Sequence, residues 1–492
     1  MKFFFYLIAI FFLFISNGKS QTIDESPSRI KPILASTSTS REPPISMSLE
    51  EAISLGLRNN RTIRSSQLHR VSQKFDLKVE ENKFTPQLVV NSSYISNRDS
   101  FNGSSATRSF TPTATVNTPT GGQISVGWEN TSIAAKGQNS ASDSALTLTF
   151  LQPLLRNAGT DIAFASVHMA RINENINLLT LKSTVNQALT NIVFSYRDLL
   201  RAQDQLDIAK NALKRSKDLM EVNRALIVAG RMAEIDLIQT EADVSTQELA
   251  SEEAENDVDA ARLALLSLIA IDSRTPVRAT DKLSIKPVYV DVNDALLTAY
   301  ENQPEYLSAL LSVELAKSNL MLAKNQRLWD LSLVAATSYN KNSSPFPNNA
   351  GFDNHKSNYV GLQLTIPIND LTPEQAQIHA ATDLEDKNLQ IEGLRQSIEQ
   401  VVRDAVRNVQ TRWRQVQIAQ RGRDLSIKKV EAEREKLRVG RSSNFQVLAY
   451  EGDLRNAESS LLNTTIAYLN ALTTLEQQQG KTLDLWKISL DN

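Results

Sequence analysis

Apolar residues in the first half of the chain recur at alternating steps of three and four. Between residues 178 and 213 this seam consists of Leu178, Leu181, Val185, Ala188, Ile192, Ser195, Leu199, Ala202, Leu206, Ala209 and Leu213. A seam sustained over about five heptads predicts a helix packed as a left-handed coiled coil. No proline or glycine occurs from Ile162 to Ala229. We therefore expect one helix on the order of 100 Å long.

Three further stretches carry the same spacing, within residues 254–268, 398–419 and 454–475. Between the stretches lie two similar segments, VAGRMAEIDLIQTEADV (228–244) and RVGRSSNFQVLAYEGDL (438–454). Each contains a Gly-Arg pair, and glycine accepts the left-handed backbone that ends many helices. The sequence therefore predicts two helical hairpins, with tips near Gly230 and Gly440.

Other segments alternate between apolar and polar residues with a period of two. They are GQISVGWENT (122–131), ALTLTFL (145–151) and NYVGLQLTIP (358–367). This period fits both an ordinary half-buried sheet and the wall of a membrane β-barrel. A secretory N-terminus and the lack of another long apolar run favour the barrel.

The two halves of the chain are repeats of unequal length. LEEAISLGLRNN (49–60) resembles VNDALLTAYENQ (292–303) at a shift of 243 positions, whereas the Gly-Arg turns match at a shift of 210. The first half is therefore longer by 33 positions, and the excess falls within 97–143. The turn-like PTGG (119–122) predicts an added hairpin there, so each chain provides either four or six strands.

The N-terminus predicts export from the cytoplasm. Lys2 precedes an apolar run of about 14 residues and then small residues, as in a cleaved signal peptide. We therefore expect a signal peptide at 1–20 and a flexible Ser/Thr/Pro-rich leader at 21–45. Repeat 1 follows at 46–275, a linker at 276–290, repeat 2 at 291–480 and a C-terminal tail at 481–492.

Composition excludes several classes of function. The net charge is −2, so we expect no nucleic-acid partner. The chain has no cysteine, its four histidines are scattered, and it has no phosphate-binding glycine loop. We expect no catalytic residues, no cofactor, no metal site and no enzymatic activity.

An unpaired strand edge is unstable in lipid, because its backbone polar groups find no water. Known barrels have at least about eight strands, more than one chain supplies. If the strands span a membrane, several copies must share one barrel, which predicts a homo-oligomer. The alternative is a soluble periplasmic coiled-coil adaptor or scaffold with an ordinary sheet. An adaptor would carry one helical hairpin, and the two tandem hairpins argue against it.

The order and spacing of these features resemble the TolC family of outer membrane efflux proteins. FLQPLLRNAGTDIA (150–163) and the two Gly-Arg segments carry the resemblance most clearly. It implies an α+β membrane protein: a homotrimer whose outer-membrane β-barrel continues into a long periplasmic α-helical barrel of coiled-coil hairpins. It also implies a passive exit duct for small molecules or polypeptides. Its partners would be outer-membrane lipid, a periplasmic adaptor (membrane fusion) protein and an inner-membrane pump or ABC exporter.

The resemblance also assigns roles to residues at the tips. Adaptor docking would involve Gly230, Arg231, Asp236, Gly440 and Arg441. Family members can close the mouth of the tunnel with aspartates six and nine residues after the second glycine. Those positions are Gln446 and Ala449 here, whereas Asp236 keeps the six-residue position in the first tip. The gating region would then be Asp236, Gln446 and Ala449, without an aspartate ring in the second tip. Nearby Glu451 and Asp453 are expected on a solvated helix face or in intersubunit ion pairs.

Overall fold

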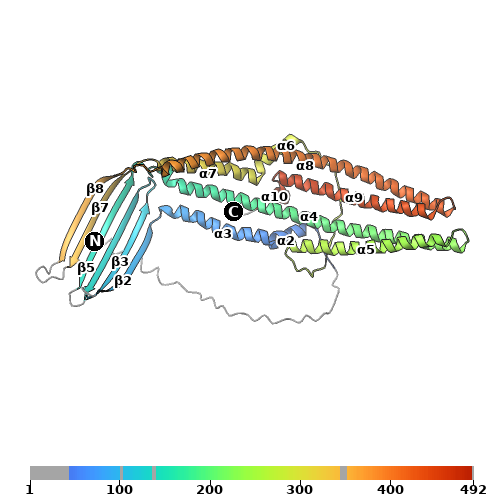
Figure 1. Ribbon diagram of the computed structural model, residues 1–492, viewed down its shortest axis with the longest axis horizontal. Coiled ribbons are helices and arrows are strands. Elements are labelled where there is room, and N and C mark those ends of the chain that lie inside the picture. Colours follow the sequence, from blue (N-terminus) through green and yellow to red (C-terminus); the bar gives the residue numbers. More distant parts are fainter. Residues whose placement is uncertain (1–43, 100–102, 136–139, 344–351, 490–492) are drawn as a thin grey trace. The chain divides into compact units, whose positions relative to one another are not determined.

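A computed structural model describes residues 44–99, 103–135, 140–343 and 352–489 (Figure 1). The predicted signal peptide and nearly all of the predicted leader lie outside these residues. Two very long helices dominate the described part: α4 (Thr160–Val228, 69 residues) and α8 (Thr372–Arg438, 67 residues). The remaining helices are α2 (Leu49–Asn59), α3 (Arg61–Glu81), α5 (Ile235–Leu268), α6 (Val292–Asn302), α7 (Pro304–Gln326), α9 (Asn444–Gln478) and α10 (Thr482–Leu485), with a short 3-10 turn at Asn82–Phe84.

The helices pair as the apolar seams predict. Helix α4 packs along α5, and α8 packs along α9. In α4 most seam residues from Leu181 to Ala209 are buried, with Ser195 and Leu206 half-buried. The buried stripe then continues through Ala212, Ser216 and Leu219, while Leu213 is only half-buried. The sequence prediction was therefore one residue off at its C-terminal end. The seam positions advance by three residues twice in succession, from 206 to 209 and from 209 to 212. These two steps shift the buried stripe around the helix and away from the predicted position 213.

None of the helices in the described part of the chain combines the length and the apolar character needed to cross a lipid bilayer.

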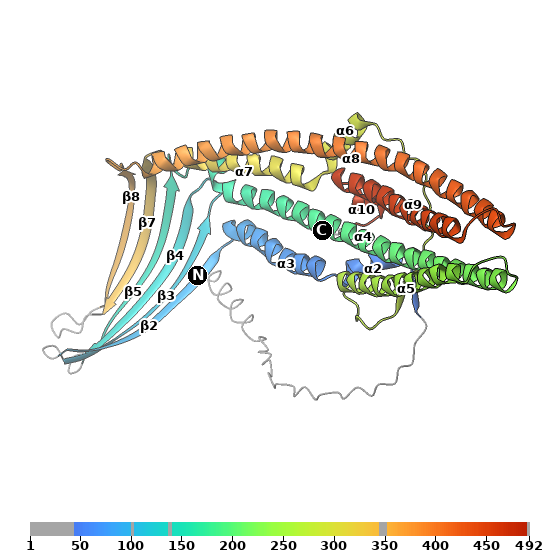
Figure 2. The same cartoon turned by 45° about the vertical axis from the view of Figure 1, so that its right-hand side comes forward.

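Six strands form one antiparallel sheet in the order β2-β3-β4-β5-β7-β8 (Figure 2). The open question of four or six strands is thereby answered as six. Their bounds are β2 Gln87–Asp99, β3 Gly103–Asn117, β4 Gln123–Ala135, β5 Ala141–Pro153, β7 Asp330–Ser343 and β8 Phe352–Thr365. Strand β5 of the first repeat pairs with β7 of the second, so the sheet is continuous across the two halves.

The two faces of the sheet differ in chemistry because the side chains alternate along each strand. One face, here called the apolar face, includes Leu88, Val90, Phe110, Val116, Val126, Trp128, Leu146, Leu148, Val360, Leu362 and Leu364. These side chains are exposed or half-buried, up to 76% exposure at Val360. The opposite face, here called the polar face, includes Asn91, Ser93, Ser109, Thr111, Thr113, Thr115, Ser125, Thr147, Thr149, Ser338, Ser357 and Gln363. On it, hydroxyl pairs join neighbouring strands, such as Ser93–Ser109 at 2.8 Å.

The helices of the two repeats correspond in order. Ser48 caps α2 and Asp291 caps α6, each through its side chain, and the two caps are equivalent positions of the repeats. Elements at the ends of the two repeats nevertheless contact each other. Strand β1 (Ile45–Met47) pairs in parallel with β6 (Val277–Ala279), which lies in the predicted linker. Helix α10 of the predicted tail places Leu483 in the same buried cluster as Met47.

Two buried clusters lie along the helices. The first joins α2, α4, α5, β1, β6 and α10, and the second joins α6, α7, α8 and α9. In the first, the hydroxyl of Tyr196 donates to the Met47 carbonyl at 2.9 Å, and burial raises the pKa of Tyr196 to about 12. In the second, the hydroxyl of Tyr468 donates to the Lys286 carbonyl at 2.8 Å. Each tyrosine thus ties an extended segment to a long helix.

A charged pair between α3 and α4 yields a pH-dependent prediction. Arg70 donates to both carboxylate oxygens of Glu174, and these hydrogen bonds lower the pKa of Glu174. The stabilisation is therefore present above the ordinary value of 4.5 and is lost as the pH falls below it. We expect Glu174→Gln to cost about 1–2 kcal/mol in the free energy of unfolding at pH 7. The difference from wild type should shrink below pH 4.5, as measured by thermal unfolding.

Glu81→Gln is the matched control. Glu81 pairs with Arg171 between the same two helices, but both side chains are far more exposed. Exposed pairs contribute little to stability. Equal losses in the two variants, or a loss in Glu174→Gln that does not change with pH, would contradict this prediction.

Candidate functional site: the hairpin tips

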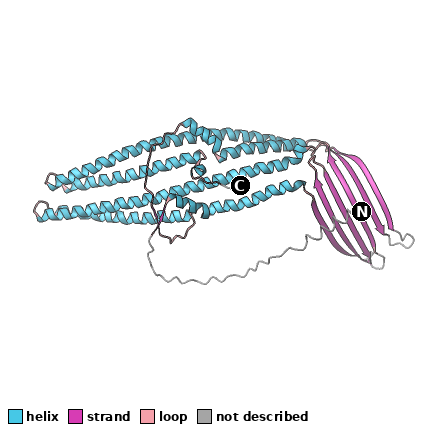
Figure 3. Cartoon of the chain, turned by 180° about the vertical axis from the view of Figure 1, so that it is seen from behind, coloured by secondary structure: helices cyan, strands magenta, loops and turns pink. Residues whose placement is uncertain are grey.

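Both hairpin tips lie at the end of the helices that is farther from the sheet (Figure 3). At the first tip, α4 ends at Val228 and α5 begins at Ile235; at the second, α8 ends at Arg438 and α9 begins at Asn444. The two tips are therefore short turns, and they place the predicted docking and gating residues close to the ends of the long helices.

The same backbone motif closes both tips. Gly230 and Gly440 have φ angles of 69° and 77°, in the left-handed region. The Arg231 N–H donates to the Leu226 carbonyl, and the Arg441 N–H donates to the Lys436 carbonyl, each at 2.8 Å. This six-to-one hydrogen bond defines a Schellman motif, which requires a left-handed residue before the donor. No heavy atom lies within 4 Å of a Cβ added at either glycine, so backbone conformation alone demands glycine there.

The second helix of each tip begins differently. Ser443 caps α9, since its side-chain oxygen accepts from the Gln446 N–H at 3.3 Å. Helix α5 follows Glu234, whose side chain makes no capping hydrogen bond. The start of α5 is therefore held less tightly by local contacts than the start of α9.

The predicted site residues fall into two groups. Arg231, Arg441 and Ala449 are exposed, as are both tip glycines. Asp236 and Gln446 are half-buried. The backbone of Asp236 contacts the second hairpin: Asn444 Nδ2 donates a hydrogen bond to the Asp236 carbonyl at 3.1 Å.

A buried polar cluster that the sequence analysis did not predict joins the two hairpins just behind the tips. Asn223 of α4 donates to Thr240 Oγ1 at 2.7 Å and to Asn444 Oδ1 at 2.8 Å. Asn444 also donates to Thr240 Oγ1 at 2.9 Å. Asn223 and Thr240 are fully buried, and Asn444 is 3% exposed. Because buried polar groups are costly without partners, this cluster fixes how α4, α5 and α9 meet.

A small apolar cluster packs beside the polar one. It is formed by Leu219, Leu437 and Val447, with Met232 and Leu448 against them. These residues come from α4, the first tip, α8 and α9. The hairpins are thus held together near their tips by a few apolar side chains and the three polar side chains.

A second set of polar contacts lies further from the tips. Arg215 of α4 pairs with Glu451 at 2.9 Å and with Glu458 at 3.3 Å, and Arg434 also pairs with Glu451. Arg455 donates to Gln247 of α5 at 2.6 Å. Glu451 is thus largely buried and pairs within its own chain, so the expectation of a solvated or intersubunit carboxylate was wrong. Only the three-dimensional packing shows this, because Arg215 and Glu451 are 236 residues apart.

The outer surface of the tips is apolar as well as charged. Val228, Ile235 and Ile238 at the first tip are 90%, 71% and 63% exposed. Val439 and Phe445 at the second are 52% and 67% exposed. Exposed apolar side chains gathered on one surface mark interaction sites. The sequence analysis named only glycines and charged residues here, although these apolar positions flank the Gly-Arg pairs.

The described residues contain no group of three or more acidic or histidine side chains that could hold a metal ion. The tips present hydrogen-bonding, ionic and apolar side chains at the ends of the long helices.

Comparisons with known proteins agree with this architecture. Residues 296–481 match the family described as outer membrane efflux protein. The alkaline protease secretion protein AprF of Pseudomonas aeruginosa is 22% identical over 353 residues, covering 68% of this chain and 69% of AprF.

Solved outer membrane channels share the fold. The CmeC channel of Campylobacter jejuni has a TM-score of 0.67 at 16% identity, covering 88% of this chain and 86% of CmeC. The open state of the MtrE channel of Neisseria gonorrhoeae has a TM-score of 0.66 at 16% identity, covering 88% of this chain and 89% of MtrE.

The buried polar cluster leads to a prediction about the tips. Asn223→Ala removes both donors that reach Thr240 and Asn444, and we expect a loss of about 1–3 kcal/mol in local stability. Amides of residues 235–245 and 440–450 should exchange with solvent faster in hydrogen-exchange mass spectrometry. Gln446→Ala is the control, because Gln446 lies at the same level but uses only its backbone N–H in capping. Unchanged exchange in Asn223→Ala would show that the cluster does not hold the hairpins together.

Proposed function

We propose that the chain is a member of the TolC family of outer membrane efflux proteins and acts as a passive exit duct that couples to partners in the periplasm and inner membrane; the match of residues 296–481, the relative AprF and the shared channel fold support this. It resides in the outer membrane, with its helical part in the periplasm. The observation that carries the proposal is the six-stranded sheet with one exposed apolar face and two unpaired edges.

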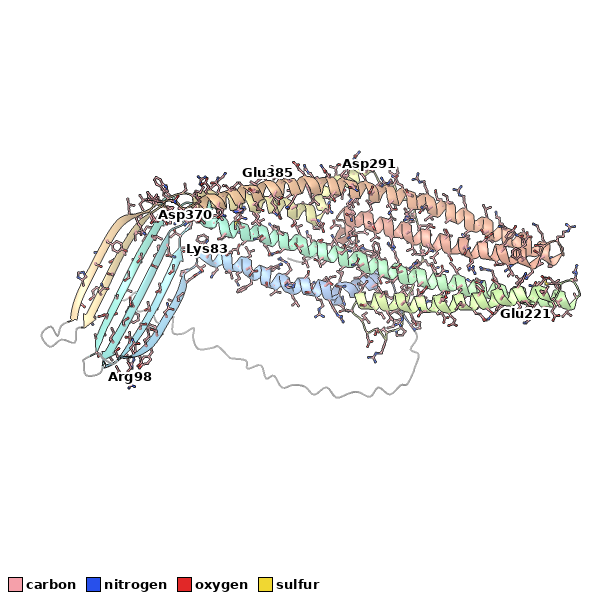
Figure 4. All side chains as sticks on the ribbon, viewed as in Figure 1. Lys83, Arg98, Glu221, Asp291, Asp370 and Glu385 are labelled. Atoms are coloured by element: carbon pink, nitrogen blue, oxygen red, sulfur yellow. The ribbon has the colours of Figure 1, made fainter. Side chains whose placement is uncertain are left out.

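The sheet has the dimensions of a membrane wall. Its strands have 13 to 15 residues, more than the roughly 9–11 that a tilted strand needs to cross a bilayer. Charged residues lie at both ends of the wall (Figure 4): Arg98 far from the helices, and Lys83 and Asp370 where strands meet helices. The apolar face between these ends suits lipid, and the polar face suits a water-filled lumen.

The edges of the sheet support a homotrimer. Within the described residues, no strand pairs with the outer edge of β2 or of β8. Such edges are unstable in lipid, so β8 of one copy would pair with β2 of the next until a ring closes. Three copies form such a ring, in keeping with the family resemblance.

The helices would continue this ring into the periplasm. In each chain α4 and α8 run from the sheet to the tips, so three copies contribute six long helices and their partners to a tunnel. The chain itself supplies no energy in this proposal, so direction must come from an inner-membrane pump or an ABC exporter. Small molecules and polypeptides are both candidate cargo.

The tips would bind a periplasmic adaptor protein. The exposed Arg231 and Arg441 offer charge-assisted hydrogen bonds, and Val228 and Phe445 offer apolar contacts beside them. Adaptor binding at this surface would draw the first hairpin away from the second. The hydrogen bonds of Asn223 and Asn444 would then break first, followed by the ion pairs of Arg215. Asp236, Gln446 and Ala449 lie at the level where the mouth would widen.

The alternative is a soluble periplasmic adaptor or scaffold. Such a protein would have to cover the apolar face of its sheet, but in this chain Leu362 is 68% exposed and Leu364 is 53% exposed. Cell fractionation, followed by a gel of the unheated outer-membrane fraction, tests the proposal directly. A heat-sensitive band near three times the chain mass supports the trimer, whereas a periplasmic monomer contradicts it.

We predict that Gly230→Val or Gly440→Val impairs export while the trimer still assembles. A β-branched residue is strongly disfavoured at the positive φ angles of these tips, so the docking surface would be distorted. Gly452→Ala is the control, because Gly452 lies within α9 and has open space around it. Export at the wild-type level in both tip variants would refute the docking role.

We predict that Leu362→Arg costs about 2–4 kcal/mol in the stability of the assembled sheet, because Leu362 faces lipid in this proposal. Leu364→Arg should behave alike. Gln363→Arg, on the polar face of the same strand, should cost far less. Heat stability of the trimer in membrane extracts measures all three, and equal stability of Leu362→Arg and Gln363→Arg would place Leu362 away from lipid.

A further inference from the structure

The extra length of the first repeat coincides with one structural unit. Strands β2 and β7 begin at Gln87 and Asp330. Their starting positions differ by 243, the same shift that relates the preceding helices of the two repeats. Strands β5 and β8 begin at Ala141 and Phe352, and their offset is close to that between the two tips. Strands β3 and β4 with their turn span 103–135, a length equal to the excess of the first repeat, and have no counterpart in the described part of the second. A complete β-hairpin has thus been added between β2 and β5.

The added hairpin is part of the wall. Strand β2 pairs with β3 along the whole length of β2, and β4 pairs with β5, so the hairpin separates two strands that would otherwise be neighbours. Its side chains continue both faces of the sheet. Val116, Val126 and Trp128 extend the apolar face, and Thr113 and Ser125 extend the polar face. This pattern is that of strands between lipid and lumen.

The turn of the hairpin is fitted to the junction with the helices. The Gly159 N–H donates to the Thr120 carbonyl at 3.2 Å, and the Thr120 hydroxyl donates to Gln152 at 2.8 Å. Gly121 has a φ angle of 85°, and a Cβ there would lie 2.2 Å from the Asn157 carbonyl oxygen. The backbone thus approaches the β5–α4 connection so closely that only glycine fits. The hairpin is anchored at the level where α4 begins.

We propose that this hairpin widens the outer-membrane pore to a ring of 18 strands, so that the pore admits polypeptides with formed secondary structure. The proposal rests on the trimer proposed above. With strands about 4.8 Å apart and tilted by about 40°, 18 strands enclose a ring about 36 Å across, whereas 12 strands enclose one about 24 Å across. Side chains occupy about 5 Å on each side, leaving about 26 Å and about 14 Å.

The difference in inner diameter determines which cargo can pass through the pore. An α-helix with its side chains is about 10–12 Å wide, so a ring of 12 strands admits one helix and a ring of 18 admits a helical hairpin. Barrels of 16–18 strands keep an aqueous channel. The polar face of this sheet is rich in hydroxyl side chains, with Val89, Ile95 and Tyr359 among them, so most of its surface can form hydrogen bonds with water in the pore. The hairpin therefore makes the outer-membrane end suitable for bulky polypeptide cargo.

The absence of cysteine from the chain allows a direct test of the bore. Thr147→Cys places one thiol on the polar face of β5, and Leu148→Cys places one on the apolar face as a control. Each substitution is made in the full chain and in a chain lacking residues 103–135. Cells are treated from outside with a small maleimide or with a maleimide carried on a two-helix hairpin peptide, which is about 20 Å wide.

We expect Thr147→Cys to react with the small maleimide in both chains, and with the hairpin peptide in the full chain only. Leu148→Cys should react with neither reagent. Equal access of the hairpin peptide to both chains, or to neither, would overturn the wider pore while leaving the channel intact. If Thr147→Cys in a heat-sensitive trimer does not react even with the small maleimide, both the lumen and the proposed channel fail.

A second measurement does not depend on the deletion variant. Electron cryomicroscopy of the extracted full-length protein counts the strands in the ring: 18 supports the proposal, and 12 with the hairpin outside the wall overturns it. Gly121→Ala should also lower the melting temperature of the trimer, because its Cβ meets the Asn157 carbonyl. Gly127→Ala is the control, since its Cβ would make only an ordinary 3.7 Å contact with Thr113.

Discussion

Backbone hydrogen bonds at the edges of the sheet are the constraint on which the rest of the architecture depends. Six strands satisfy one another from β2 to β8, but the outer edges of those two strands face away from the sheet. In water such edges cause aggregation, and in lipid they cannot persist at all. In the proposed duct the apolar face requires lipid and the edges require other copies, so membrane insertion and oligomerisation would be coupled.

In the proposed duct the hairpin tips meet a different requirement, since they would have to be both stable and able to separate. Apolar contact near the tips is limited to a small cluster around Leu219, Leu437 and Val447. Much of the remaining contact is polar, through Asn223, Thr240 and Asn444. When the hairpins separate, hydrogen bonds between these side chains can be replaced by hydrogen bonds to water. Separating a large apolar interface would instead expose apolar surface to water. The composition of the interface therefore suits a reversible opening.

The sequence allows the periodic parts of this fold to be predicted. The three-and-four spacing from Leu178 onward predicted α4, the alternation in 145–151 predicted β5, and the Gly-Arg pairs predicted both tips, because each depends on residues close together in the chain. Contacts between distant residues could not be predicted. Asn223 and Asn444 lie 221 residues apart, and no local pattern marks either as buried. The pairing of β1 with β6 was missed for the same reason. The exposed side chains of Val228 and Phe445 were missed although they flank the Gly-Arg pairs, because periodicity does not distinguish an exposed apolar side chain from a buried one.

The position of Leu483 in the first buried cluster has a consequence for biosynthesis. That cluster includes Met47 near the start of the described chain and Tyr196 in α4, yet it also needs Leu483, far later in the sequence. The core of the first repeat is therefore incomplete until Leu483 has been translated. If the chain is exported through the inner membrane, as its N-terminus predicts, this arrangement helps, because the N-terminal half cannot reach its final packing while the second repeat is still being synthesised.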